Sequence, residues 1–95
     1  MSKNVIVCDI GASGARVFKA ALSSGKLSLS ELHRFSNKPI IVGSSLYWDI
    51  VALYEGLKRG IAAGGREAVS IGIDAFSNDF LLVDRTGAIS EPPHT

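Results

Sequence analysis

The residues best suited to chemistry form one short stretch, which reads Asp9-Ile10-Gly11-Ala12-Ser13-Gly14-Ala15-Arg16. A turn of small residues exposes successive backbone N–H groups, and these can form a concave site for phosphate oxygens. We expect Gly11 and Gly14 to supply positive φ angles and close backbone approach. Ser13 adds a hydroxyl donor and Arg16 a positive charge, while Asp9 is placed to hold Mg²⁺ directly or through water. The stretch therefore predicts a phosphate-binding turn, with an ordinary hairpin as the alternative.

This glycine-containing turn matches neither of the two common nucleotide-binding signatures. A Walker A loop needs Lys followed by Ser or Thr after its second glycine, and a dinucleotide fold needs G-x-G-x-x-G. Here the turn lies between two expected strands rather than between a strand and a helix.

Hydrophobic periodicity predicts three strands, one helix and further strands, in that order. Residues 4–10 form a β-branched run typical of a central strand covered on both faces. Residues 36–47 are predicted as a loop, and Asp49 is the expected N-cap of a helix that ends near Ala63. Gly64-Gly65 is expected to end this helix with a left-handed cap. The other predicted segments are strands at 16–23, 27–32, 68–74 and 79–83, tight turns at 23–26 and 84–87, and a last short strand from 88.

This β-β-β-α-β order predicts an α/β fold of the ribonuclease-H-like, actin-like ATPase type, with a mixed sheet. A right-handed crossover places strand 68–74 parallel to strand 4–10. Asp9 and Asp74 then meet at the carboxyl ends of neighbouring parallel strands, where ligands bind in such sheets. Together with Glu55, these acids also resemble the metal-binding set of a ribonuclease-H-type nuclease, which we keep as a less favoured alternative.

Composition limits the classes of protein that the chain can belong to. Its 95 residues allow one small domain, and 46% hydrophobic content excludes intrinsic disorder. A formal net charge of +1 gives no basic surface for nucleic acid. No apolar run is long enough to span a bilayer. The lone cysteine, Cys8, lies in an apolar run and is expected to be a buried core residue of a cytoplasmic protein.

The stretch from Asp9 to Arg16 resembles the first phosphate motif of the FGGY carbohydrate kinases, within the actin/hexokinase/sugar-kinase superfamily. Further segments resemble the opening of rhamnulokinases, in the same order and at similar spacing. They are Glu31-Leu32-His33-Arg34-Phe35, Tyr47-Trp48-Asp49-Ile50, Ile71-Gly72-Ile73-Asp74 and Asp79-Phe80-Leu81-Leu82-Val83-Asp84 with Gly87.

The resemblance implies ATP-dependent phosphorylation of a ketose or polyol hydroxyl. It assigns the ATP phosphates to the turn from Gly11 to Arg16 and places Asp9 near the Mg²⁺. It assigns part of the sugar pocket to Asp74, Phe76, Ser77 and Asn78. Rhamnulokinases typically read Asp-Thr-Trp-Gly-Val-Asp-Phe where this chain reads Asp74-Ala75-Phe76-Ser77-Asn78-Asp79-Phe80, so the particular sugar stays open.

The resemblance also implies that the chain, residues 1–95, is the truncated N-terminal part of a larger kinase domain. The catalytic base and the adenine contacts of the family lie in downstream segments and a C-terminal lobe. We therefore expect a small-molecule sugar as partner, no nucleic acid or membrane, and no kinase activity from this chain alone. The alternative is a non-catalytic remnant or a sugar-binding regulatory piece.

Overall fold

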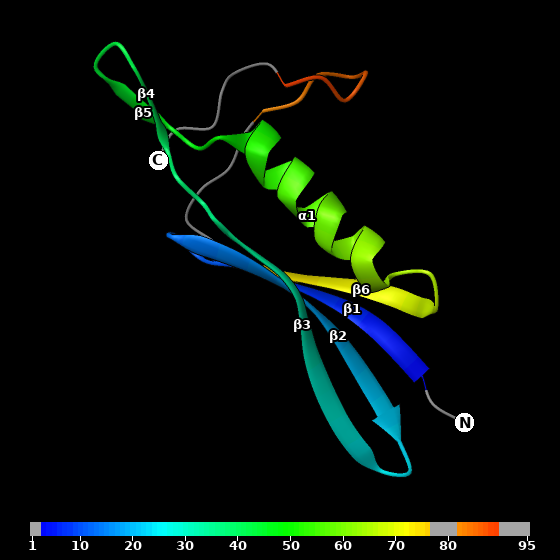
Figure 1. Ribbon diagram of the computed structural model, residues 1–95. Helices are drawn as coiled ribbons and strands as arrows, with labels where there is room; N and C mark the ends of the chain where they lie inside the picture. Colours follow the sequence, from blue (N-terminus) through cyan, green and yellow to red (C-terminus); the bar gives the residue numbers. More distant parts are fainter. Residues whose placement is uncertain (1–2, 77–81, 90–95) are drawn as a thin grey trace.

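A mixed β-sheet forms the centre of the described part of the chain, and one helix crosses one face of this sheet (Figure 1). The computed structural model describes residues 3–76 and 82–89. The main sheet has the strand order β3-β2-β1-β6, and β4 and β5 form a separate hairpin. The elements are β1 (Lys3–Ile10), β2 (Gly14–Ser23), β3 (Lys26–Ser36), β4 (Ile40–Val42), β5 (Ser45–Tyr47), α1 (Ile50–Gly64) and β6 (Ala68–Ala75).

The predicted topology is confirmed. β1 pairs antiparallel with β2, and β2 pairs antiparallel with β3. After the α1 crossover, β6 returns parallel to β1, with Asp9 opposite Asp74 in the register. This mixed sheet of four strands with one helix is compatible with an incomplete lobe of the actin-like ATPase fold.

The third strand is longer than the sequence pattern indicates. It continues to Ser36 instead of ending near residue 32. Leu32 is inserted as a bulge opposite β2, and the pairing resumes beyond it, shifted by one residue. The bulge breaks the period-2 alternation and so hides the second half of the strand from a periodicity argument.

The predicted loop at 36–47 is wrong in part, because it contains the β4–β5 hairpin. Val42 pairs with Ser45, so Gly43 and Ser44 form a two-residue connection, and Gly43 adopts φ 63°. Two-residue hairpins favour glycine because they require positive φ. At 23–26 the predicted tight turn is confirmed, with Ser24 and Gly25 both at positive φ.

The helix begins where predicted but ends differently. Asp49 caps it, since its carboxylate accepts a hydrogen bond of 3.1 Å from the Ala52 amide. The predicted left-handed cap is wrong: Gly65 has φ −84° and ψ −13°, a right-handed conformation. The Ala68 amide instead donates to the Gly65 carbonyl, which turns the chain into β6.

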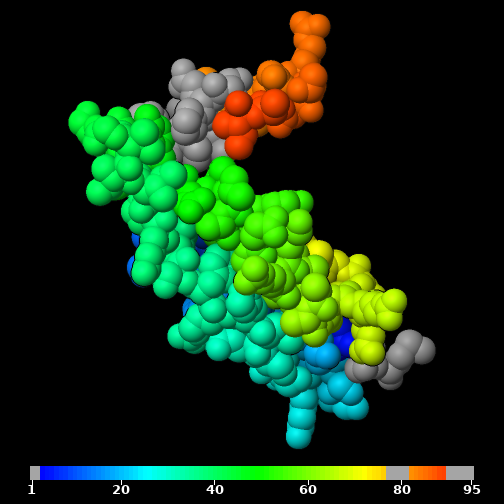
Figure 2. Space-filling model, turned by 45° about the horizontal axis from the view of Figure 1, so that its top comes forward, coloured from blue at the N-terminus to red at the C-terminus, as the bar shows by residue number. Residues whose placement is uncertain are grey.

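Glycines form the part of α1 that lies closest to the sheet. A Cβ atom at Gly56 would lie 2.5 Å from the Phe35 ring, and one at Gly60 would collide with Val17. Figure 2 shows the helix residues lying directly against those of β3. Two apolar side chains of α1, Leu57 and Ile61, pack against the core.

The core is small and lies between α1 and the sheet. Its largest fully buried side chains are Ile6, Cys8 and Val17. The predicted burial of Cys8 is confirmed, and burial raises the pKa of its thiol. The expectation that β1 is covered on both faces is met on the α1 side only, within the described residues.

The strand β6 has the predicted position, and its hydrophobic side chains are largely exposed. Within the described residues nearly all of it is exposed, including Ile71 and Ile73 on the helix side. The hydrophobic sequence of β6 therefore suggests more burial than the other described residues provide.

The segment after β6 is described only in part. Residues 79–81 of the predicted strand 79–83, and Ser90, lie outside the described residues. Val83 forms an isolated antiparallel bridge with Ile89 around the predicted turn, where Gly87 has φ 90°. A hydrogen bond from the Thr86 hydroxyl, with others from backbone amides, lowers the pKa of Asp84. No helix in the described part of the chain is long and apolar enough to cross a membrane.

Replacing Gly60 by alanine is expected to destabilise the fold by about 1–3 kcal/mol, because the added methyl group overpacks the contact with buried Val17. Urea denaturation measures the change. Gly72→Ala is the matched control, since nothing lies within 4 Å of a Cβ there. Equal stability of the two variants would contradict the close packing of α1.

The Cys8 thiol is expected to resist alkylation at neutral pH in the folded chain. Its raised pKa keeps it protonated, and its burial blocks access. Labelling rates with and without urea measure this protection. Rapid labelling under native conditions would show that the strand β1 is not buried against α1.

Candidate functional site

Three hydrogen bonds hold the turn that joins β1 to β2. The Gly11 amide donates to the Gly14 carbonyl at 2.9 Å. Asn37, which is only 4% exposed, donates its backbone amide to the Ser13 carbonyl and its side-chain amide to the Gly11 carbonyl, at 3.1 and 3.0 Å. Carbonyls of the turn accept all three bonds. The shape of the turn is therefore fixed without using the amides of Ala12 and Ser13 at its tip.

The amides at the tip of this turn are available to a ligand. Ala12 and Ser13 are exposed, and within residues 3–76 and 82–89 their N–H groups have no hydrogen-bond acceptor. The expected positive φ of Gly11 and Gly14 is wrong, since neither residue has it. Gly11 instead allows close approach, because a Cβ there would lie 3.2 Å from the Gly14 carbonyl oxygen.

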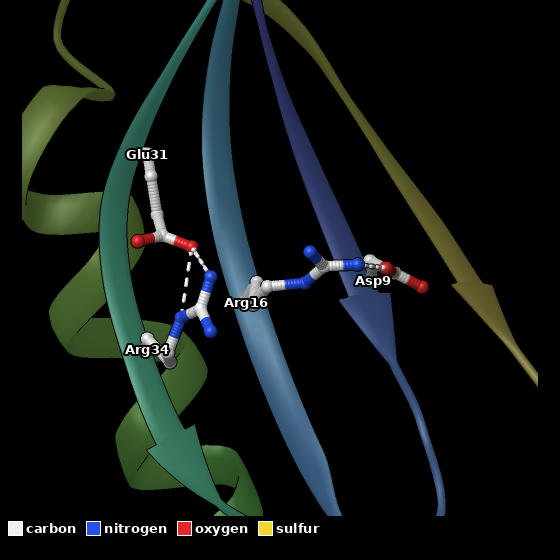
Figure 3. Close-up of polar contacts among 4 residues, drawn as sticks. All are labelled: Asp9, Arg16, Glu31 and Arg34. Carbon is white, nitrogen blue, oxygen red and sulfur yellow. Dashed lines mark hydrogen bonds and ion pairs between the residues drawn. The ribbon is translucent and has the colours of Figure 1, made fainter.

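Asp9 and Arg16 form an ion pair beside the turn. The Arg16 Nη2 atom lies 2.6 Å from Asp9 Oδ2, and both side chains are well exposed, at 44% and 36%. The two residues are register partners on β1 and β2, on the sheet face opposite the buried Cys8 and α1 (Figure 3). In the structure the predicted metal-binding carboxylate is therefore held by the predicted phosphate-binding guanidinium.

A second arginine lies close to the turn from Gly11 to Ala15 and the Asp9–Arg16 pair, which together we call the corner. Arg34 of β3 lies opposite Arg16 in the register, and its guanidinium binds Glu31 at 2.7 Å (Figure 3). Arg16 and Arg34 line a pocket of about 200 Å³ together with residues of the turn. Arg34 and Asn37 were not predicted as site residues. Both lie beyond the bulge at Leu32: Arg34 falls between the predicted strand 27–32 and the predicted loop 36–47, and Asn37 falls within that loop.

The predicted sugar-pocket residues are placed only in part. Asp74 is exposed at the carboxyl end of β6, next to Asp9. The Phe76 ring packs against the Trp48 ring, with centroids 5.1 Å apart, beside an apolar pocket of about 400 Å³ that Trp48 lines. Ser77 and Asn78 lie outside the described residues.

The acidic side chains at this edge suit a cation that arrives with its own ligands. Asp9 and Asp74 are neighbours, and no group of three or more His, Cys, Asp or Glu able to hold a metal occurs in the described residues. Mg²⁺ is typically held by one or two carboxylates together with phosphates and water, so this donor set fits a phosphate-bound Mg²⁺.

The third acid of the nuclease alternative, Glu55, does not lie beside Asp9 and Asp74. Glu55 lies on α1, which covers the face opposite Asp9, and it is exposed and paired with Lys58 at 3.3 Å. The described residues therefore do not bring together the three acids that a two-metal nuclease site would use.

Comparisons with known proteins relate the sequence to sugar kinases. No protein-family model matches the chain. It is 39% identical to the rhamnulokinase of Bacteroides thetaiotaomicron, over 99% of this chain and 20% of that protein. It is 42% identical to the rhamnulokinase of Oceanobacillus iheyensis, over 83% of this chain and 17% of that one, and 38% identical to that of Pectobacterium atrosepticum, over 90% and 18%. The chain spans about a fifth of the length of the curated relatives it matches.

Fold and sequence together define the class of the chain. Its sheet and helix are compatible with part of an actin-like ATPase lobe, the architecture of sugar kinases that the motifs predicted. Within that class the sequence is rhamnulokinase-like over nearly its whole length, which confirms the resemblance.

Replacing Asn37 by alanine is expected to loosen the turn and to cost about 1–3 kcal/mol, because the Gly11 carbonyl loses its donor. Hydrogen exchange at residues 11–14 and urea denaturation measure the effect. Asn4→Ala is the control, since its side chain makes only a 3.4 Å exposed contact with Glu67. Unchanged exchange at the turn in Asn37→Ala would show that Asn37 does not hold it.

Proposed function

We propose that this chain supplies the ATP-phosphate corner and part of the sugar pocket of an ATP-dependent sugar kinase. The acceptor is a hydroxyl of a ketose or polyol of the rhamnulose type. The observation that carries the proposal is the turn held by Asn37. Its Ala12 and Ser13 amides, which have no acceptor among the described residues, lie beside Arg16. The similarity to rhamnulokinases supports the choice of substrate class.

Each residue of the corner has a distinct task in this proposal. The backbone from Gly11 to Ala15 donates N–H groups to phosphate oxygens, and Ser13 adds its hydroxyl. Arg16 contributes a guanidinium that can bind phosphate through two hydrogen bonds. Asp9 holds Mg²⁺, which when bound neutralises phosphate charge and favours departure of ADP.

The Asp9–Arg16 ion pair prepares both side chains for that task. An exposed ion pair contributes little stability, at most about 1 kcal/mol, so a polyanion can displace it cheaply. Arg16 then passes from the carboxylate to the phosphate, and Asp9 is freed to face the cation. The pair thus keeps two opposite charges in position before the nucleotide arrives.

The sugar lies on the β6 side of the corner in this proposal. Asp74 offers a carboxylate to sugar hydroxyls, and Phe76, Ser77 and Asn78 continue the pocket. Because phosphoryl transfer depends on positioning by both sides of a closed cleft, the catalytic base and adenine contacts come from further parts of the kinase. The kinase acts in the cytoplasm, and residues 1–95 form part of one domain within it.

A chimera tests the proposal: this chain replaces the matching segment of the Bacteroides thetaiotaomicron rhamnulokinase, and rhamnulose-dependent ADP release is measured. Asp9→Asn is expected to lower kcat/KM for ATP by at least about tenfold, because one charged ligand of the cation is lost. Glu67→Gln is the control, since it removes one exposed negative charge away from the corner.

Two outcomes would contradict the proposal. One is an active chimera whose Asp9→Asn variant matches Glu67→Gln. The other is sugar-dependent ATP turnover by the 95-residue chain alone, which would place the whole catalytic machinery within it.

A further inference from the structure

Two positive charges face each other across neighbouring strands at the corner. Arg16 on β2 and Arg34 on β3 are direct register partners, and both lie on the face away from α1 (Figure 3). Like charges directly opposite in a sheet are destabilising. Each guanidinium here is balanced by its own carboxylate, Asp9 for Arg16 and Glu31 for Arg34.

Arg34 keeps unused hydrogen-bonding capacity. Its Nε and Nη2 atoms both donate to a single oxygen, Glu31 Oε1, at 3.0 and 2.7 Å. A guanidinium has five N–H groups, so further donors stay free for another acceptor. The side chain is 65% exposed and lines the same pocket of about 200 Å³ as the turn and Arg16.

We propose that Arg34 is a second phosphate-binding residue, which acts with Arg16 as a two-arginine clamp on the polyphosphate chain. This inference rests on the proposed function, because it assigns a further binding residue to the same corner. A phosphate group between the two guanidinium groups accepts from both and replaces the charge balance that Asp9 gives Arg16 in its absence. Glu31 binds Arg34 beside the pocket in the absence of ligand and competes with the ligand for its donors.

Titration of the 95-residue chain with tripolyphosphate tests the clamp, with the amide shifts of residues 12–14 as readout. Arg34→Gln is expected to weaken binding by up to about fivefold, the loss typical of one exposed charge pair. Glu31→Gln is expected to tighten it, because a competing carboxylate is removed. Arg34→Lys keeps the charge without the planar fork and recovers part of the affinity.

Arg59→Gln is the matched control. It removes the same charge from the exposed surface of α1, which packs on the other face of the sheet. At 0.15 M salt the screening length is about 8 Å, so this distant charge has little effect at the corner. ATP is expected to give the same dependence on Arg34 as tripolyphosphate, since the clamp contacts phosphate rather than adenine.

The outcomes separate the clamp from the function on which it rests. If Arg34→Gln binds like Arg59→Gln while Arg16→Gln binds weakly, the clamp is wrong and the phosphate corner stands. If the unaltered chain gives no shifts at residues 12–14, both are overturned. If Arg34→Gln weakens binding and Glu31→Gln tightens it, Arg34 is a phosphate ligand.

Discussion

The hydrogen bonds from Asn37 into the turn between β1 and β2 are the constraint on which the proposed site depends. They satisfy the Gly11 and Ser13 carbonyls from a buried position, and the Gly11 amide closes the turn onto Gly14. The turn is thereby rigid without the use of its outer amides. A binding site that must attract an anion benefits from donors that are already oriented, because little ordering entropy is lost on binding.

Asn37 reaches the turn only because β3 runs past its bulge to Ser36. The same strand carries Glu31 and Arg34 to the face where Asp9 and Arg16 lie. The glycines of α1 allow the helix to lie close against β2 and β3 on the other face. The crossover then brings β6 alongside β1 and sets Asp74 next to Asp9.

Much of this arrangement could be predicted from the sequence, because it follows from local patterns and one handedness rule. The β-branched run before Asp9, the Asp49 cap and the order of elements define the sheet and its parallel pair. The cluster of small residues after Asp9 marks the turn. The resemblance to sugar kinases is likewise carried by residue types and their spacing alone.

The features that escaped prediction depend on tertiary contacts. From the sequence, Gly56 and Gly60 are simply residues that destabilise a helix. In the structure they lie directly against Phe35 and Val17, which leave no room for a side chain. Gly11 is required by a close backbone contact rather than by a positive φ, and no periodicity distinguishes the two. Arg34 belongs to the corner through a bulge that changes the side to which the following residues point.

The most direct test of the phosphate corner is a crystal structure of the chain with Mg²⁺ and a non-hydrolysable ATP analogue. We expect phosphate oxygens on the amides of Ala12 and Ser13, with the Arg16 guanidinium moved from Asp9 to the phosphate. A nucleotide bound elsewhere, or one bound with the Asp9–Arg16 pair intact and the turn untouched, would contradict it.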